Sequence, residues 1–211
     1  MRAVILSGGR IKDYEYVKKF TKNALIICAD KGYNHSVKMG VKPHILIGDF
    51  DSVGSLPDDN NIEKISYPAD KDKTDTHLAL EYAFNRNFEE ILIFGAIGSR
   101  MDHTLSNILM TITYSGKITV MDEHNKIWSV RDSIILHEEP GTIVSILPIG
   151  QVYGVTTSGL KYPLYKKDID VTKEPSLGIS NVMTEKKAEI TVEKGVIIVM
   201  VTSDRSLGFN E

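Results

Sequence analysis

The 211-residue sequence predicts an α/β protein, in which a parallel sheet with flanking helices is followed by a small all-β sandwich domain. Two observations lead to this prediction. Up to about residue 125, runs that are apolar nearly throughout alternate with longer mixed segments, as expected for strands covered on both faces. After residue 125, short β-rich runs follow one another between polar, glycine and proline turns. We therefore expect an N-terminal Rossmann-like domain over residues 1–125 and a β-sandwich domain over residues 126–211.

The elements of the first domain follow from this alternation. The apolar runs are expected to form the strands, at residues 3–6, 24–29, 44–49, 90–96 and 117–122. The mixed segments are expected to form the helices, at residues 13–20, 32–40, 73–86 and 101–115. Gly40 is expected to close the second helix, because glycine readily adopts the left-handed conformation found after helix ends. The third helix is the richest in good helix formers.

The second domain is expected to contain strands and no convincing helix. Residues 126–150 and 152–165 show short β-rich runs that are separated by turns. Residues 188–203 are expected to form a hairpin, because the turn-like sequence EKG separates two apolar runs there.

Composition narrows the possible classes of protein. Hydrophobic residues make up 42% of the chain and charged residues 25%, which is typical of a folded globular protein. The net charge of −3 and the lack of a basic run give no reason to expect nucleic acid binding. No apolar stretch approaches the roughly 20 residues that span a bilayer, and the N-terminus does not resemble a signal peptide, so we expect no membrane association and a cytoplasmic location. The single cysteine, Cys28, is expected to be a core residue rather than a nucleophile.

Acidic residues lie where two of the expected strands end. Asp30 ends the second strand, and Asp49 and Asp51 lie at the end of the third. Ligands of open parallel sheets bind beyond the carboxyl ends of the strands, so these side chains are expected at one edge. A hard cation such as Mg²⁺ commonly takes one or two carboxylates together with substrate phosphates. The alternative is that residues 49–52 form an Asx-rich turn, which collects aspartates for conformational reasons alone.

A second acidic cluster lies near the start of the third helix. Asp72 and Asp75 are three residues apart, so they are expected to share one side of the helix and to suit its positive N-terminus. The alternative is that Asp72 or Thr74 is an ordinary N-cap. Two acidic clusters at the same predicted sheet edge favour a metal site.

The sequence GAIGSRMDH, at residues 95–103, follows the fourth expected strand. Gly95 and Gly98 allow a ligand to approach the backbone closely, and Arg100 offers a bidentate fork for phosphate. Asp102 and His103 then begin a helix, and His103 could act as a general base. The alternative is a glycine turn with an Asp N-cap, a surface arginine and an exposed histidine. The P-loop pattern GxxxxGK[ST] does not occur, which excludes a Walker-type NTPase.

Five short sequences occur in a characteristic order along almost the whole chain. They are CADKG (28–32), GDFDS (48–52), KDKTD (71–75), GAIGSRMDH (95–103) with SN (106–107), and SLGISN (176–181). This set resembles thiamine pyrophosphokinase of the bacterial type. The resemblance implies an α/β nucleotide-binding catalytic domain followed by a β-sandwich thiamine-binding domain, in a homodimer that binds thiamine between the two subunits. It also implies transfer of the pyrophosphoryl group of ATP to the thiamine hydroxyl, giving thiamine diphosphate and AMP, with Mg²⁺ as cofactor.

The resemblance further implies roles for individual residues. It implies Mg²⁺ binding by Asp49, Asp51 and Asp75, and a catalytic role for these three residues together with Asp72 and Arg100. It implies nucleotide binding by Asp30, Lys31, Arg100, Asp102, His103 and Asn107. It implies thiamine binding, from the partner subunit, by Ser176, Ser180 and Asn181.

Several alternatives stay open at this stage. The same aspartates could serve a Mg²⁺-dependent phosphohydrolase, a nucleotide-sensing module without catalysis, or a kinase that transfers one phosphoryl group and releases ADP. Asp72 is the first choice for a base that takes the hydroxyl proton. Trp128 or one of the nine tyrosines could stack on the cationic thiamine, although Trp128 fits equally well in the core of the second domain.

Overall fold

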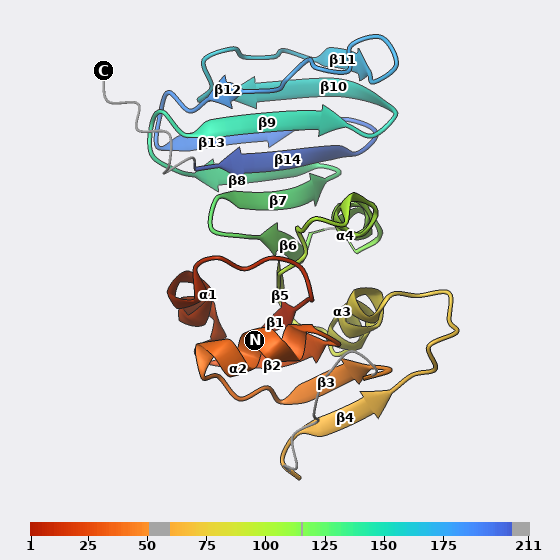
Figure 1. The fold of residues 1–211 in the computed structure, drawn as a ribbon. Helices are drawn as coiled ribbons and strands as arrows, with labels where there is room; N and C mark the ends of the chain where they lie inside the picture. Colours follow the sequence, from red (N-terminus) through yellow and green to blue (C-terminus); the bar gives the residue numbers. More distant parts are fainter. Residues whose placement is uncertain (51–59, 115, 204–211) are drawn as a thin grey trace. The chain divides into compact units, whose positions relative to one another are not determined.

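The computed structural model describes residues 1–50, 60–114 and 116–203, so Asp51 of the predicted metal site lies outside the described residues. The chain divides into two compact units, which are unit 1 (residues 1–123) and unit 2 (residues 124–211) (Figure 1). No helix in the described ranges is long and apolar enough to cross a membrane.

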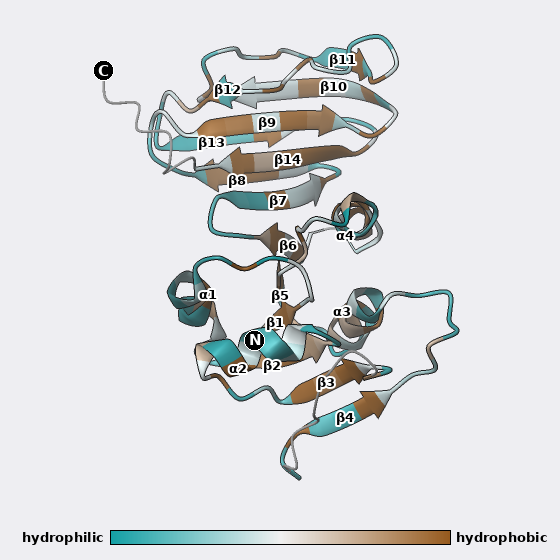
Figure 2. Cartoon of the chain, in the orientation of Figure 1, coloured by the Kyte–Doolittle hydropathy of each residue, from teal (hydrophilic) through white to brown (hydrophobic). Residues whose placement is uncertain are grey.

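In its described residues, unit 1 forms a sheet of six parallel strands in the order β6-β5-β1-β2-β3-β4. These strands are β1 (Arg2–Leu6), β2 (Ala24–Ala29), β3 (Ile45–Gly48), β4 (Glu63–Ser66), β5 (Glu90–Phe94) and β6 (Ile118–Met121). All four residues of β3 are buried, whereas β4 begins with two exposed charged residues. Figure 2 shows the matching difference in hydropathy, with β3 mostly hydrophobic and the start of β4 hydrophilic. The sequence pattern misses β4, because this strand lies at the sheet edge and lacks an apolar run.

Four helices cover this sheet in the described part of unit 1. They are α1 (Tyr14–Thr21), α2 (Gly32–Met39), α3 (Asp75–Asn85) and α4 (Met101–Thr113). Helices α1 and α2 pack against each other on one face, and α3 packs against α4 on the other face (Figure 1). The predicted α/β class is therefore confirmed, with all four predicted helices present.

The helix ends decide between two of the alternatives left open by the sequence. Thr74 is the N-cap of α3, because its hydroxyl accepts a hydrogen bond from the backbone N–H of His77 (3.2 Å). The helix therefore begins at Asp75, and Asp72 lies before it as an exposed residue. The expectation that Asp72 and Asp75 share one side of a helix is wrong. Gly40 ends α2 with a φ of 62°, as predicted.

The core of unit 1 follows the alternation of side chains along the strands. One face of the sheet packs under α1 and α2, and its buried residues include Val4, Leu6, Cys28, Leu92 and Phe94. Cys28 is fully buried, which raises the pKa of its thiol to about 12, although a hydrogen bond with Ser36 acts in the opposite direction. The prediction that Cys28 is a core residue is confirmed.

The order of the strands reverses between β1 and β5. The chain adds β2, β3 and β4 on one side of β1, and β5 with β6 on the other. The segments that follow β1 and β5 then run side by side, because Gly9 N donates to Gly95 O (2.8 Å) and Arg10 N donates to Ile97 O (2.9 Å). Such a reversal of strand order is the usual position of the ligand crevice in open α/β sheets.

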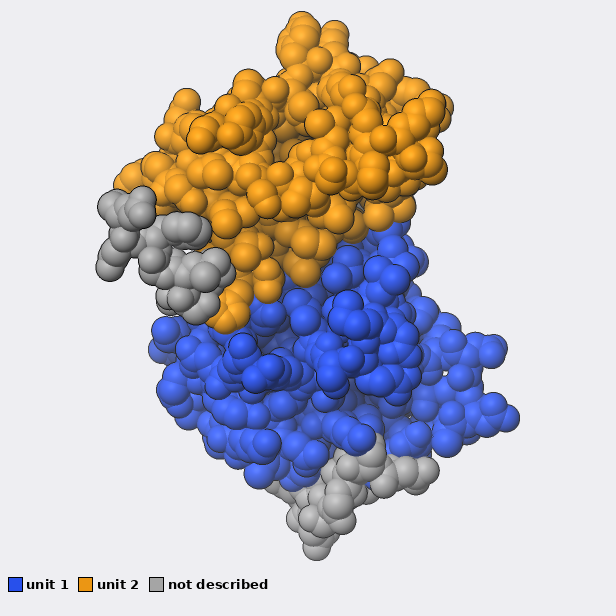
Figure 3. Space-filling model, turned by 45° about the horizontal axis from the view of Figure 1, so that its top comes forward, with its two compact units in different colours: residues 1–123 blue, residues 124–211 orange. Residues whose placement is uncertain are grey.

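In its described residues, unit 2 forms a sandwich of two antiparallel sheets (orange in Figure 3). One sheet has the order β12-β9-β14-β7, and the other has the order β11-β10-β13-β8. The strands are β7 (Asn125–Val130), β8 (Ser133–His137), β9 (Ile143–Pro148), β10 (Gln151–Ser158), β11 (Lys167–Asp170), β12 (Asn181–Val182), β13 (Lys187–Thr191) and β14 (Ile197–Thr202). Buried residues from both sheets form one core, which half-buried Trp128 contacts. The predicted sandwich is confirmed.

The predicted hairpin over residues 188–203 is wrong. Strand β13 pairs with β8 and β10, whereas β14 pairs with β7 and β9, so the two strands lie in different sheets. The turn between them crosses from one sheet to the other. A turn between two apolar runs fixes neither the partner nor the sheet of the following strand.

We predict that Gly32→Ala destabilises unit 1 more than Gly40→Ala. A Cβ atom at Gly32 would lie 1.8 Å from Leu6 O in the backbone of β1, so α2 would have to move, at a cost of about 2–3 kcal/mol. A Cβ atom at Gly40 meets nothing within 4 Å, and only its left-handed backbone conformation costs about 1 kcal/mol. Urea unfolding of both variants measures the difference, and equal losses would contradict the close packing at Gly32.

Candidate active site

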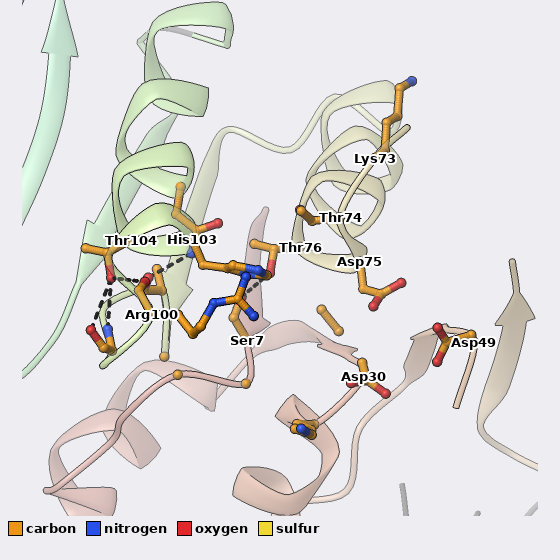
Figure 4. Close-up of a pocket in the computed structure, with 18 of the residues that line it drawn as sticks. Ser7, Asp30, Asp49, Lys73, Thr74, Asp75, Thr76, Arg100, His103 and Thr104 are labelled. Atoms are coloured by element: carbon orange, nitrogen blue, oxygen red, sulfur yellow. Dashed lines mark hydrogen bonds between the residues drawn. The ribbon is translucent and has the colours of Figure 1, made fainter. Parts of the chain in front are cut away.

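A polar pocket of about 400 Å³ opens in unit 1 at the carboxyl ends of β1, β2, β3 and β5 (Figure 4). Its lining comes from the segments after these strands, from the residues before α3 and from the first two turns of α4. Predicted site residues among the lining are Asp30, Lys31, Asp49, Asp75, Arg100, His103 and Asn107. The structure therefore brings together most of the predicted residues of unit 1.

Glycines form the part of the pocket that lies nearest the strand reversal. A Cβ atom at Gly9 would lie 2.3 Å from Gly95 O, so only glycine permits this backbone approach. Two side chains of α4 hold the segment after β5. Buried Asn107 donates from its Nδ2 to Ala96 O (2.7 Å), and the Thr104 hydroxyl accepts a hydrogen bond from Gly98 N (3.1 Å). Asn107 thus shapes the pocket wall through the backbone.

His35 of α2 supports the segment after β1 from outside the pocket. Its Nε2 lies 2.8 Å from Gly9 O, and its Nδ1 lies 3.0 Å from the Tyr14 hydroxyl. Because a carbonyl oxygen only accepts, Nε2 holds the ring proton and Nδ1 of the neutral ring accepts from Tyr14. Burial lowers the pKa of His35 and the nearby charge of Lys38 adds to this effect, while the hydrogen bond to Gly9 opposes it.

The carboxylates of Asp30, Asp49 and Asp75 form one side of the pocket and point toward the same space (Figure 4). Asp30 has a φ of 44°, a left-handed conformation that is uncommon for residues other than glycine. Burial raises the pKa of Asp75, and the negative charges of Asp30 and Asp49 add to this effect. A cation beside these carboxylates would offset the repulsion that Asp30 and Asp49 exert on Asp75.

Lys71 supplies a positive charge among these carboxylates. Its Nζ lies 3.0 Å from Asp75 Oδ1 and 4.0 Å from Asp49 Oδ2. The contact with Lys71 opposes the rise that burial causes in the pKa of Asp75 but does not cancel it. The sequence reasoning assigns no role to Lys71, although it lies within the KDKTD segment. Its position four residues before Asp75 is the signal in the sequence that would have identified it as a counter-charge.

Arg100 reaches the pocket from the N-terminus of α4. Its Nε donates to Asp102 Oδ1 (2.9 Å) and its Nη2 donates to Asp102 Oδ2 (2.5 Å), so the carboxylate of Asp102 fixes the plane of the guanidinium. This pair lowers the pKa of Asp102 well below its usual range. Asp102 is absent from the lining of the pocket as described, so it acts on the pocket by orienting Arg100.

Two further predicted residues, Asp72 and Asp51, are not among the described residues that line this pocket. Asp72 is exposed and does not line the pocket in the described part of the chain. Asp51 lies outside the described residues. The sequence reasoning also misses Ser7 and Thr76, which line the pocket and whose hydroxyls form a hydrogen bond (2.9 Å).

The predicted thiamine-binding residues lie in unit 2, with Ser176 and Ser180 on the turn before β12 and Asn181 at the first position of that strand. Ser176 and Ser180 are exposed, and Ser180 has a φ of 57°. Asn181 is buried and its amide is used within the unit. Its Oδ1 accepts from Tyr162 N (3.0 Å) and Val182 N (2.9 Å), and its Nδ2 donates to Tyr162 O (2.8 Å). Asn181 therefore ties the turn at 176–181 to the segment that contains exposed Tyr162.

The fold and the pocket together define an α/β protein with a polar pocket at the carboxyl edge of a parallel sheet. Residues 16–121 match the family model "Thiamin pyrophosphokinase, catalytic domain", and residues 132–197 match "Thiamin pyrophosphokinase, vitamin B1 binding domain". The chain belongs to the thiamine pyrophosphokinase family.

Individual members of this family are similar to the chain over nearly its whole length. The chain is 32% identical to thiamine pyrophosphokinase of Bacillus subtilis (strain 168), over 87% of its own length and 89% of the relative's. The crystal structure of thiamine pyrophosphokinase from Bacillus subtilis has a TM-score of 0.85 at 26% identity, with 97% of this chain and 100% of that chain covered. The thiamin pyrophosphokinase structure from Geobacillus thermodenitrificans has a TM-score of 0.84 at 25% identity, with 98% and 99% covered.

We predict that His35→Gln flattens the dependence of stability on pH. The pKa of His35 is lowered in the folded chain, so the unfolded chain binds more protons as the pH falls through about 6.5. The free energy of unfolding of the native protein therefore decreases on acidification. Chemical denaturation between pH 7.5 and 5.5 measures this slope. His137→Gln, at an exposed position of β8, is the control, and an unchanged slope in the His35 variant would contradict the prediction.

We predict that Asn181→Ala destabilises unit 2 by about 1–3 kcal/mol, because it leaves backbone groups of Tyr162 and Val182 without their partner. Ser180→Ala, at the exposed neighbouring position, is expected to cost less than about 0.5 kcal/mol. Thermal unfolding followed by circular dichroism compares the two variants. A mild effect of Asn181→Ala would show that these three hydrogen bonds contribute little.

Proposed function

We propose that the chain transfers the pyrophosphoryl group of ATP to the hydroxyl group of thiamine, with thiamine diphosphate and AMP as products. Membership of the thiamine pyrophosphokinase family supports the reaction. The observation on which the proposal depends most is the gathering of Asp30, Asp49, Asp75 and Arg100 around one pocket at the strand reversal. Residues 1–125 thus act as the nucleotide-binding catalytic domain, and residues 126–211 as the thiamine-binding domain, in the cytoplasm.

The chemistry is a displacement at the β-phosphorus of ATP. The hydroxyl oxygen of thiamine forms a bond to this phosphorus, while the bond to the oxygen that bridges the α- and β-phosphates breaks. The electron pair of the broken bond stays on that oxygen, which leaves with AMP, and the hydroxyl proton passes to a base. Transfers of this kind have loose transition states, so positioning and charge stabilisation contribute most of the catalysis.

The donor set of the pocket fits Mg²⁺. Asp49 and Asp75 offer carboxylate oxygens on one side of the pocket, and the repulsion among the three acidic side chains favours a cation there. In the described residues, no group of three or more acidic, histidine or cysteine side chains is arranged as a complete metal site. Mg²⁺ ordinarily completes its shell with water and substrate phosphates, so a partial protein shell suits it. When bound, Mg²⁺ would offset the charge of the phosphates. Asp51 is proposed as a third ligand.

The other residues of the pocket bind and orient the nucleotide in this proposal. Arg100, held in plane by Asp102, presents its remaining N–H groups to a phosphate. Lys31 and His103 line the same pocket and add hydrogen-bond donors. Asn107 holds the backbone against which the phosphates rest. Asp72 remains the proposed proton acceptor, although its exposed position requires it to turn toward the pocket.

Thiamine binding is proposed for unit 2 of a partner subunit, in a homodimer. Ser176 and Ser180 are exposed on the turn before β12, where a ligand can reach them. Asn181 supports this turn through Tyr162 instead of offering a free amide. Mixing an Asp49→Asn variant with a Ser176→Ala/Ser180→Ala variant tests the shared site. Recovery of activity on mixing supports it, and no recovery above the sum of the two variants contradicts it.

A product assay tests the reaction directly. The purified protein is incubated with ATP, Mg²⁺ and thiamine, and chromatography separates the nucleotides and thiamine species. Thiamine diphosphate and AMP are expected in equal amounts. ADP with thiamine monophosphate would contradict attack at the β-phosphorus. Nucleotide breakdown without thiamine would indicate a hydrolase, and no turnover on any acceptor would indicate a nucleotide-binding module.

We predict that Asp49→Asn lowers kcat by about 100-fold or more while the fold persists, because it removes a charge proposed to hold the cation beside the phosphates. Asp51→Asn is expected to abolish turnover in the same way. Asp70→Asn, an exposed residue outside the described lining of the pocket, is the control. Steady-state kinetics and circular dichroism check activity and fold, and full activity of both Asp49→Asn and Asp51→Asn would refute the metal assignment.

A further inference from the structure

Lys71 occupies the position between two proposed metal ligands. Its Nζ lies 3.0 Å from Asp75 Oδ1 and 4.0 Å from Asp49 Oδ2, and its side chain is only 15% exposed. A third contact fixes the ammonium, because it donates a hydrogen bond to Pro68 O (3.0 Å). The ammonium group of Lys71 is thus held on the acidic side of the pocket by three contacts.

An ammonium group in this position and a divalent cation at the same carboxylates compete with each other. Both would use oxygens of Asp49 and Asp75, and two positive charges within a few ångströms repel strongly in a partly buried site. Binding of a metal ion to these oxygens is therefore expected to displace Lys71. The flexible four-carbon stem of lysine permits this movement, and the residue lines the pocket, so the displaced ammonium stays within it.

We propose that Lys71 is a resident counter-ion, which neutralises Asp49 and Asp75 in the nucleotide-free protein and moves to a phosphate of the nucleotide when a divalent cation takes its place. The movement of Lys71 to a phosphate rests on the proposed function. The competition between Lys71 and a metal ion does not depend on it. Lys71 consequently weakens binding of the metal alone and strengthens binding of the metal–nucleotide complex. It makes the two bind as a unit.

Lys73 offers a matched control within the same segment. It also lines the pocket, but its Nζ pairs with Glu81 of α3 (2.7 and 2.8 Å) and its side chain is 44% exposed. Lys73→Met removes the same charge two residues away without freeing Asp49 or Asp75. Lys71→Arg keeps a positive charge between the carboxylates.

The first measurement is Mn²⁺ binding to the nucleotide-free protein, followed by the electron paramagnetic resonance signal of free Mn²⁺. Lys71→Met is expected to bind Mn²⁺ about tenfold more tightly than the native protein, within the usual range of coupling between sites. Lys71→Arg and Lys73→Met are expected to stay near the native affinity. Unchanged or weaker binding by Lys71→Met would overturn the proposal, and so would an equal gain in Lys73→Met, which would indicate a general effect of net charge.

The second measurement is calorimetric binding of MgATP in the absence of thiamine, so that no acceptor is present. Lys71→Met is expected to bind MgATP about tenfold more weakly than the native protein, although it binds the metal alone more tightly. A purely structural role would move both affinities in the same direction, and that result would overturn the proposal. Absence of MgATP binding to the native protein would refute the proposed function, while the Mn²⁺ measurement would still decide the competition.

A thermal measurement covers the case in which Lys71→Met unfolds easily without metal. Its melting temperature is then expected to rise more on addition of Mg²⁺ than that of the native protein, because the metal replaces the missing counter-ion. An equal or smaller rise would overturn the proposal.

Discussion

The pocket exists because two backbone segments, after β1 and after β5, approach each other at hydrogen-bond distance. Gly9 N donates to Gly95 O, and a Cβ atom on either residue would collide with the opposite backbone. This contact lies where the strand order reverses, and there the segments that follow β1 and β5 line a common space. His35 below it and Asn107 beside it fix the same two segments through backbone carbonyls. The charged residues are useful only because this frame places them.

Charges of both signs lie around that frame, and several of them form ion pairs. Arg100 is paired with Asp102, and Lys71 is paired with Asp75 and Asp49. Without a ligand, the pocket is therefore close to internally neutralised. A strongly charged ligand therefore binds by replacing these ion-pair partners. In the ligand-free protein, the ion pairs reduce the electrostatic cost of three neighbouring carboxylates.

The sequence predicts those features that depend on local pattern. Buried strands show as apolar runs, and caps such as Gly40 show as residue types, because both are decided within a few residues. Strand β4 is not predicted, because an edge strand needs no apolar run. The predicted β13–β14 hairpin is wrong, because strand pairing depends on contacts across the whole sandwich. The three-residue spacing of Asp72 and Asp75 misleads, since the helix begins only at Asp75. Lys71 pairs with Asp75, only four residues away, and this pairing could have been expected from the sequence. The contacts of Asn181 with Tyr162 join segments that only the folded chain brings together, so spacing does not predict them.

Cys28 gives the chain a single built-in reporter of opening. The thiolate is the reactive form of cysteine, and the burial that raises the pKa of this thiol to about 12 also shields it from reagents. Because the sequence contains one cysteine, any modification of the native protein by a thiol reagent records an event in which the sheet of unit 1 has separated from α2. The rate of that labelling therefore follows the local opening of the unit that contains the pocket, without an introduced probe.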